Sequence, residues 1–337
     1  MVRVGIVGVT GYAGEELLGL LLKHPYVKIT NLSAKIDEPK VLSKIFPKFN
    51  KRCELMCFLP NLEKISKSCD LIFLALPHNV SMDFVPYLVK KKKRVIDLSA
   101  DYRLKDVNIY EKFYHTLHKD SLNLKKAVYG LPEIYRSKIK KAQLIANPGC
   151  YPTVSILALL PLLKFNLIEQ NSIIIDAKSG ATGAGRKLTE NLLFSEINED
   201  FKAYKVNAHQ HIPEINQELS KIANKNIEVV FVPHLLPLNR GILVTIYVKK
   251  KSFKQKEYLE LYKEFYKDEP FVRVKDKGEF PTLKDVIYTN YCDIGIKEDK
   301  DLLIIIACID NLLKGASGQA VQNMNIMFGW KETVGII

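Results

Sequence analysis

Cys150 lies in the pattern of a strand-to-helix turn, where a thiol is readily activated. Residues 143–146 are short and apolar enough for a strand, and the run after Pro152 is apolar enough for a buried helix. A thiol in the first turn of a helix meets the positive end of the helix dipole, which favours the nucleophilic thiolate. The pattern therefore predicts a nucleophile, although a cysteine taken at random is more often a buried structural residue.

His209 and His211 are the next candidates for chemistry. Cysteine chemistry needs a nearby group that takes and returns protons, and either imidazole suits that role. A His-x-His pair can also bind zinc, but no third ligand stands at a recognisable spacing, so we expect no metal. The two rings share a face if the segment is a strand and diverge if it is a turn, so the sequence leaves open which one reaches the sulfur.

A glycine-rich turn near the N-terminus predicts a nucleotide site. Residues 8–14 read Gly-Val-Thr-Gly-Tyr-Ala-Gly between an apolar strand pattern and a helix pattern, which is the phosphate cradle of a dinucleotide-binding unit. The spacing is G-x-x-G-x-x-G, so a tight turn without a ligand is the alternative. After the next strand, over 27–32, the chain has Ser33 and Lys35 where an NAD site carries an acidic residue, and this predicts NADP(H).

Further candidates follow other predicted strands. Strands over 70–76 and 94–98 lead into Pro77-His78 and into a segment that ends with Arg103. Ligands of open α/β sheets bind outside the carboxyl ends of the strands, so His78 could approach a cofactor and Arg103 an anionic substrate. A loop histidine and a structural arginine are the alternatives. Residues 179–186 form a glycine-rich loop whose N–H groups can hold phosphate or an oxyanion.

Composition narrows the class of protein. The length of 337 residues suits two domains, and the net charge of +13 comes from lysines that are mostly scattered, which favours an anionic substrate over nucleic acid. The six cysteines form no C-x-x-C motif, which indicates reduced thiols in a cytoplasm. We expect neither a targeting peptide nor a membrane helix, because the chain enters a strand at once and no apolar run reaches about 20 residues.

The pattern after Cys150 changes to successive strands with helices between them. Strand-like runs lie at 172–177, 227–232, 242–248 and 302–309, and one intervening helix is expected over 254–267. This order suits a mixed, largely antiparallel sheet with helices on one face. Asn311 is expected to cap the helix that follows it.

Together these motifs resemble the N-acetyl-γ-glutamyl-phosphate reductase family of the semialdehyde dehydrogenase superfamily. The resemblance runs nearly end to end and is carried by residues 8–18, 74–78, 97–103, 129–133, 147–153, 176–186, 209–214 and 310–325. It implies NADPH-dependent reduction of N-acetyl-L-glutamyl 5-phosphate to the 5-semialdehyde and phosphate, through a cysteine thioacyl intermediate in arginine biosynthesis. It also implies an α/β fold: a Rossmann domain over 1–149 completed by a C-terminal helix over 312–337, and an α+β catalytic domain over 150–311.

The resemblance implies a role for individual residues. Cys150 would be the nucleophile and His209 the acid/base. The residues that would bind substrate are Arg103, Asn147, Ser179, Gly180, Arg186, His211 and Glu214. Those that would bind NADP(H) are Gly8, Thr10, Gly11, Tyr12, Gly14, Ser33, Lys35, Pro77 and Asn311. The expected assembly is a homodimer or homotetramer that acts on a small molecule, without nucleic acid or membrane.

The chain departs from the family pattern at two places. Gln210 stands where an arginine is expected between the two histidines, which puts an arginine contact to substrate in doubt. Ala34 stands where an arginine is expected after the serine, so the preference for NADP(H) need not be strict. A cysteine hydrolase, an RNA-binding protein and the lysine-pathway relative that acts on a carrier-linked aminoadipyl phosphate are the alternatives. The forms of 147–153 and 179–186 favour the arginine pathway over that relative.

Overall fold

The computed structural model describes residues 1–251 and 257–337, which form two compact units. One unit comprises Met1–Pro148 and Ala316–Ile337, and the other comprises Gly149–Gly315. The chain therefore leaves the first unit directly before Cys150 and returns to it shortly after Asn311. None of the helices in the described ranges is long and apolar enough to cross a membrane.

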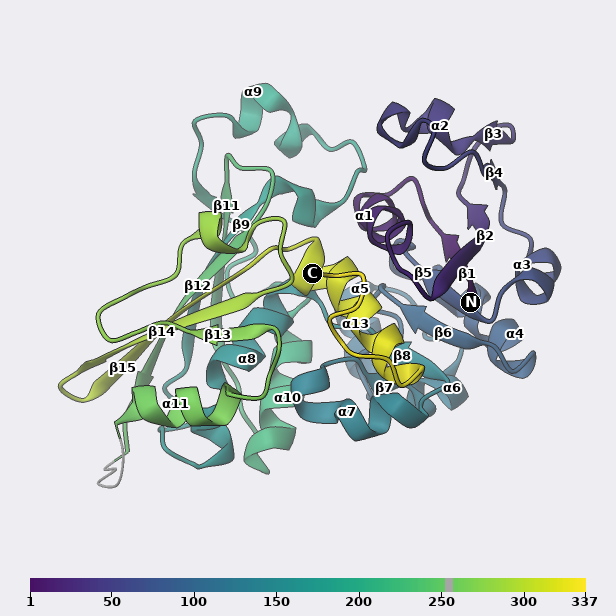
Figure 1. The fold of residues 1–337 in the computed structure, drawn as a ribbon. Coiled ribbons are helices and arrows are strands. Elements are labelled where there is room, and N and C mark those ends of the chain that lie inside the picture. The colour runs from purple at the N-terminus through teal and green to yellow at the C-terminus, as the bar shows by residue number, and fades with distance from the viewer. Residues whose placement is uncertain (252–256) are drawn as a thin grey trace. The chain divides into compact units, whose positions relative to one another are not determined.

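The first unit is built on an eight-stranded sheet in the order β3-β4-β2-β1-β5-β6-β8-β7 (Figure 1). Its strands are β1 Val2–Val7, β2 Val27–Ser33, β3 Lys40–Val41, β4 Met56–Phe58, β5 Leu71–Leu74, β6 Arg94–Asp97, β7 Val128–Tyr129 and β8 Leu144–Ala146. All neighbouring strands pair in parallel except β3 with β4. The loops that follow β1, β5, β6 and β8 therefore leave the same edge of the sheet, as the Rossmann prediction requires.

Helices cover both faces of this sheet. They are α1 Tyr12–Leu21, α2 Leu42–Ile45, α3 Leu62–Ser68, α4 Val85–Lys90, α5 Val107–Tyr114, α6 Ser121–Lys126, α7 Pro132–Lys141 and α13 Gly318–Met327. One apolar core joins α1 and α7 to α13, and a second core lies under α3, α4 and α6. The last helix of the chain therefore packs on the sheet built by the first half.

The C-terminal helix is shorter than the predicted 312–337. A π-helical turn, Leu313–Ser317, precedes α13, and the helix ends at Met327 because the chain turns at Gly329, which has a φ of +71°. The expected cap was also wrong. Asp310, not Asn311, accepts the N–H groups of Leu312 and Leu313, because the Asn311 side chain is turned to other partners.

The second unit is a seven-stranded sheet in the order β10-β11-β9-β12-β15-β14-β13. Its strands are β9 Ile174–Gly180, β10 Lys202–Ala203, β11 Val230–Leu236, β12 Ile242–Lys249, β13 Val272–Val274, β14 Cys292–Asp299 and β15 Leu302–Ile309. Two pairs, β9 with β11 and β13 with β14, are parallel and the others are antiparallel. The mixed, largely antiparallel sheet is confirmed.

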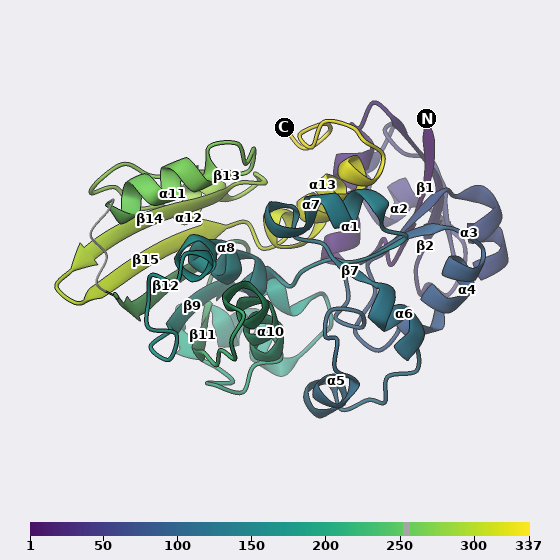
Figure 2. The same cartoon turned by 90° about the horizontal axis from the view of Figure 1, so that it is seen from below.

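Helices α8, α10 and α11 lie on one face of the second sheet (Figures 1 and 2). The helices of this unit are α8 Cys150–Lys164, α9 Phe194–Ile197, α10 Ile212–Ala223, α11 Tyr258–Tyr266 and α12 Leu283–Val286. The expected helix over 254–267 corresponds to α11, and its residues 254–256 lie outside the described residues. Strand β14 was not predicted, because Asp293 and Gly295 interrupt its apolar pattern; Asp293 is buried and paired with Arg273.

Helix α8 contains a proline, and a side chain of the neighbouring helix α11 replaces the hydrogen bond that this proline removes. Pro161 has no N–H, so the carbonyl of Leu157, four residues earlier, loses its helical donor. The Tyr266 hydroxyl donates to that carbonyl over 2.5 Å, and the Tyr262 hydroxyl donates to the carbonyl of Ala158. Both tyrosines are buried, so α11 completes the hydrogen bonding of the helix that begins at Cys150.

Replacement of Tyr266 by phenylalanine should destabilise the protein by about 1–3 kcal/mol, because the buried carbonyl of Leu157 is left unsatisfied. Pro161→Ala supplies a new N–H to the same carbonyl, so the penalty should shrink in that background. Urea unfolding of the single and double variants measures the coupling. Tyr262→Phe is the matched control, because its partner carbonyl does not face residue 161. Equal penalties for Tyr266→Phe in both backgrounds would contradict the argument.

Candidate functional site

The glycine-rich turn of the first unit can accept only glycine at two positions. Gly8 has a φ of +93°, and a Cβ on it would lie 2.2 Å from the carbonyl oxygen of Ala75. A Cβ on Gly14 would lie 2.2 Å from the carbonyl oxygen of Gly8. The N–H of Gly11 bonds to the same oxygen, and Tyr12 begins α1. The turn is therefore compact, as a cradle that brings backbone N–H groups to a phosphate must be.

The other predicted cofactor residues differ in whether their side chains are accessible to a ligand. The carbonyl of Ser33 accepts the N–H groups of Gly8 and Val9, while its buried hydroxyl donates to Asn31. Lys35 and Pro77 are exposed, and Lys35 follows the end of β2 by two residues. Lys35 thus presents a cation just after β2, and its contact with the 2′-phosphate of NADP stays a prediction.

Arg103 and Asn147 have structural partners within the first unit. The Arg103 guanidinium donates to the carbonyls of Leu98 and Asn147, and the side chain is 4% exposed. It therefore ties together the chain segments that follow β6 and β8. The Asn147 amide donates to the Ala316 carbonyl and accepts from Asn323. These contacts join the start of the cysteine motif to the returning C-terminal segment, and a role for either residue in substrate binding stays a prediction.

Cys150 is the first residue of α8, as predicted. It is partly exposed, whereas the other five cysteines are buried. Gly315 packs against it so closely that a Cβ there would lie 2.8 Å from the Cβ of Cys150. Burial raises the pKa of the Cys308 thiol to about 12, so that cysteine is inert. Cys150 is consequently the thiol best placed to react.

The two histidines lie in a turn before α10, and both rings contact Tyr151. The ring centroids of His209 and His211 are 5.4 and 6.0 Å from that of Tyr151, the residue next to Cys150. The structure therefore brings the predicted acid/base candidates to the start of α8. Tyr204 and Phe231 complete an aromatic surround for His209, with centroid distances of 5.7 and 5.6 Å.

The protonation state of His209 follows from its surroundings. Its Nδ1 accepts the backbone N–H of His211 over 3.1 Å, so the proton of the neutral ring sits on Nε2. Burial, assisted by the charge of Lys205, lowers the pKa of His209 to about 3. The ring is therefore neutral near pH 7 and can donate a hydrogen bond from Nε2.

Tyr151 and Tyr204 are site residues that the sequence did not single out. Their hydroxyl oxygens are 3.1 Å apart. Burial raises the pKa values of both, that of Tyr204 to about 12, and the nearby Cys150 contributes to both shifts. Two neutral hydroxyls thus lie near the thiol. Tyr151 belongs to the cysteine motif, whereas Tyr204 lies 54 positions after Cys150 and no local sequence pattern marks it.

The glycine-rich segment 179–186 begins inside β9, because that strand runs on to Gly180. Ser179 is buried and Arg186 is exposed. The Asn311 amide donates to Thr182 Oγ1 and accepts the N–H of Gly241, so it braces this segment against the start of β12. Asn311 was predicted to hold the cofactor; the structure shows its bracing contacts, and the cofactor role stays a prediction.

A buried ion pair supports the same region. Arg240 binds both carboxylate oxygens of Asp310 at 2.9 and 3.1 Å, and Asp310 also accepts the N–H of Tyr288. Asp310 is fully buried, so removal of Arg240 would leave an uncompensated charge. Arg240 was not predicted from the sequence, because a single arginine after a strand carries no distinctive pattern.

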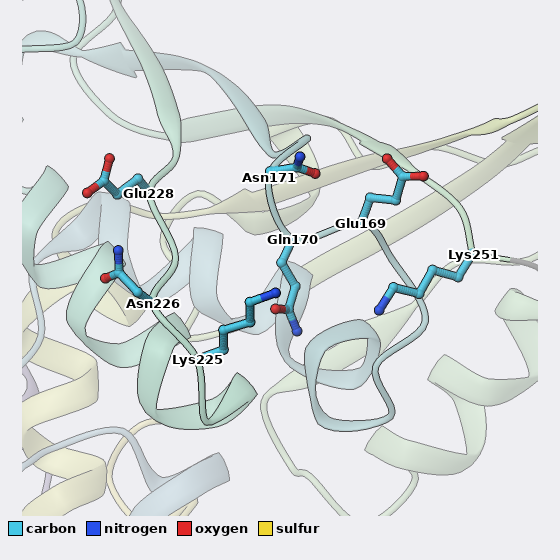
Figure 3. Close-up of a pocket in the computed structure, with 7 residues that line it drawn as sticks. All are labelled: Glu169, Gln170, Asn171, Lys225, Asn226, Glu228 and Lys251. Carbon is cyan, nitrogen blue, oxygen red and sulfur yellow. The ribbon is translucent and has the colours of Figure 1, made fainter.

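The surface pocket shown in Figure 3 is separate from these residues. It has a volume of about 670 Å³ and is lined by Glu169, Lys225 and Lys251, among others. Glu169 and Lys225 follow the C-terminal ends of α8 and α10, whereas Cys150 and His211 lie at their N-terminal ends. The 15 residues of α8 span roughly 22 Å, so the pocket is remote from the thiol. No group of three metal-binding side chains occurs within the two described ranges.

Comparison with known proteins gives both halves of the chain the same relatives. Residues 3–142 match the family model of the semialdehyde dehydrogenase NAD binding domain, and residues 150–311 match that of the semialdehyde dehydrogenase dimerisation domain. The chain is similar in fold to aspartate semialdehyde dehydrogenase II of Vibrio cholerae, with a TM-score of 0.74, 17% identity and coverage of 98% and 99% of the two chains. It is also similar to the aspartate semialdehyde dehydrogenase of Candida albicans, with a TM-score of 0.69, 16% identity and coverage of 97% and 98%.

Relatives with higher identity narrow the family. The chain is 49% identical to N-acetyl-gamma-glutamyl-phosphate reductase of Alkaliphilus metalliredigens, over 100% of this chain and 98% of the relative. The protein of that name from Geobacter metallireducens is 49% identical over the same shares. The chain therefore belongs to the N-acetyl-gamma-glutamyl-phosphate reductase family of the semialdehyde dehydrogenases.

Proposed function

We propose that the protein reduces N-acetyl-L-glutamyl 5-phosphate to N-acetyl-L-glutamate 5-semialdehyde and phosphate, with NADPH, as a step of arginine biosynthesis in the cytoplasm. The observation that carries the proposal is the partly exposed Cys150 at the start of α8, with both histidine rings against the next residue. Family membership over the whole chain supports the choice of substrate.

In this proposal the Cys150 thiolate attacks the acyl carbon, phosphate leaves, and a thioester to the enzyme remains. NADPH held at the glycine turn of residues 8–14 would supply the hydride that reduces the thioester. The resulting thiohemiacetal would release the aldehyde and regenerate the Cys150 thiolate. His209 can donate from Nε2 to the oxygen that becomes negative in both halves of the reaction. Segment 179–185 with Arg186 stays a predicted phosphate contact from its sequence. In the structure the N–H groups of Gly180, Ala181, Thr182 and Gly185 already bond to carbonyls of the protein.

NADP(H) fits the first unit. At Gly8 and Gly14 a side chain would collide with backbone carbonyls of the protein itself, so glycine keeps the turn as tight as a pyrophosphate cradle requires. Lys35 supplies a positive charge at the end of β2, where an acidic residue would favour NAD. Thr10, Gly11, Tyr12 and Pro77 belong to the loops at the same edge and stay predicted contacts.

The reverse reaction tests the proposal directly. Phosphate-dependent reduction of NADP is measured with N-acetyl-L-glutamate 5-semialdehyde and, separately, with aspartate semialdehyde. We expect activity with the first aldehyde and no need for a carrier protein. Activity confined to aspartate semialdehyde would reject the substrate, and an absence of NADPH binding would favour a cysteine hydrolase instead.

Cys150→Ser should fold and bind NADPH but lose turnover, because an alkoxide forms far less readily than a thiolate near pH 7. Steady-state rates and cofactor titration measure the two properties. Cys308→Ser is the control and should alter stability more than rate, since that thiol is buried in β15. Near-normal turnover of Cys150→Ser would end the assignment of the nucleophile.

His209→Asn should reduce kcat by about 10²–10⁴-fold, the usual contribution of a general acid–base group. His211→Asn should reduce it less, because its ring is further from Tyr151. Rates of both variants under saturating substrate give the comparison. If His211→Asn has the larger effect, the two roles are exchanged.

We also assign the open face of the second sheet to a second copy of the chain. Half-buried apolar side chains at alternate positions of β11, β12 and β15 lie on the face opposite α8, including Val232, Leu243, Tyr247 and Ile304. A paired cluster of Asp176, Lys178 and His234 lies among them. The matched dimerisation model covers this sheet. A dimer is the smallest assembly that buries the face, and a monomeric mass in sedimentation would reject it.

A further inference from the structure

The start of α8 has an unusual requirement for a hydrogen-bond acceptor. Gly149 is the N-cap residue, is buried and offers no side chain. In a capping box, a glutamate or glutamine at the third helical position accepts the N–H of the N-cap residue. Here that position is Pro152, which cannot supply an acceptor. The acceptor for the Gly149 N–H must therefore come from another element.

Glu214 supplies it. Its Oε1 accepts the Gly149 N–H over 2.8 Å, and the side chain is 1% exposed. Glu214 lies in the first turn of α10, directly after the turn that contains His209 and His211. One carboxylate therefore joins the helix start that carries Cys150 to the helix start that follows the histidine pair.

We infer that Glu214 is a positioning residue that fixes Cys150 relative to the two histidines through the Gly149 N–H. The inference rests on the proposed role of Cys150 as the nucleophile. It goes beyond the substrate contact that the family resemblance implies for Glu214, since it gives the carboxylate a partner inside the protein. A misplacement of about 1 Å at a reacting group can reduce a rate by about 10²-fold, so such a brace has catalytic consequences.

The charge of Glu214 has a second, separable effect. A carboxylate near the thiol opposes formation of the thiolate, because like charges repel. The titratable groups around Cys150 include Tyr151, Tyr204, His209 and His211. Burial raises the pKa values of the two tyrosines and lowers that of His209, so these three are neutral near pH 7. Nearby cations include Lys205 beside His209, the buried Lys314 next to Gly315, and Arg240, which is paired with Asp310. Loss of the Glu214 charge should thus ionise the thiol at lower pH.

Three variants separate the two effects. Glu214→Gln keeps an oxygen acceptor for Gly149 but removes the charge, and Glu214→Ala removes both. Glu218→Gln is the matched control, because Glu218 is equally buried one turn further along α10 but is paired with Lys221. For each variant we measure kcat and KM, the urea midpoint, and the pH profile of Cys150 alkylation by iodoacetamide, with Cys150→Ser as the blank.

Glu214→Gln should move the alkylation midpoint down by about one pH unit, and it should reduce kcat by less than Glu214→Ala does, because it keeps an acceptor for the Gly149 N–H. Glu214→Ala should show the same shift, a lower urea midpoint and a kcat reduced at least about tenfold with KM changed less. Glu218→Gln should match the parent protein in kcat and in the alkylation profile.

Two results would overturn the inference. The first is a raised KM with unchanged kcat and an unchanged alkylation profile in Glu214→Ala, which is the signature of a substrate contact. The second is the same kcat loss and alkylation shift in Glu218→Gln as in the Glu214 variants. The alkylation and urea readouts need no substrate, so failure of the proposed reaction would appear separately, as turnover retained by Cys150→Ser or absent from the parent protein.

Discussion

The N-terminus of α8 must satisfy buried backbone N–H groups and still present a reactive thiol. A side-chain cap or a local glutamate would satisfy the donors, but Gly149 and Pro152 rule out both. Glycine keeps bulk away from the turn, and proline removes one donor. The remaining N–H of Gly149 is paired by Glu214 from α10. The position of Cys150 therefore depends on how α8 and α10 pack.

That dependence extends through the second unit. The carbonyl that Pro161 leaves without a helical donor is paired by a tyrosine of α11, so α8 is held from two neighbouring helices. The turn after β15 packs Gly315 against Cys150 and is itself fixed by the buried pair of Asp310 and Arg240. Several elements far apart in the sequence thus converge on one helix start. Each contributes a hydrogen bond or a close contact that a local motif could not provide.

The sequence predicted those features that depend on local spacing. Strand, glycine turn and helix at the N-terminus, and strand, turn and helix around Cys150, follow from residue types within about ten positions. Strand β14 was missed because its buried Asp293 is stabilised by Arg273, a partner on another strand. Partners that are distant in sequence also explain why three other features were not predicted. These are the sites of Tyr204 and Arg240 and the hydrogen bond from the Gly149 N–H to Glu214. The length of the last helix was overestimated because Phe328, Trp330 and Ile336 are apolar like helix residues. In the structure they lie in the turns after α13 and pack against the core from there.

The environment of His209 narrows how the thiol can be activated. A pKa of about 3 means that the ring carries no charge near pH 7, so a stable thiolate–imidazolium pair would have to overcome the burial that lowers this pKa. With Nδ1 engaged by the His211 N–H, the ring instead offers an Nε2 donor. A donor stabilises a thiolate or an oxyanion that has already formed. In the proposed mechanism, stabilisation of the thiolate would be shared between this donor and the N-terminal end of α8, against the opposing charge of Glu214. Glu214 therefore fixes the position of Cys150 and, through its charge, also opposes ionisation of the Cys150 thiol.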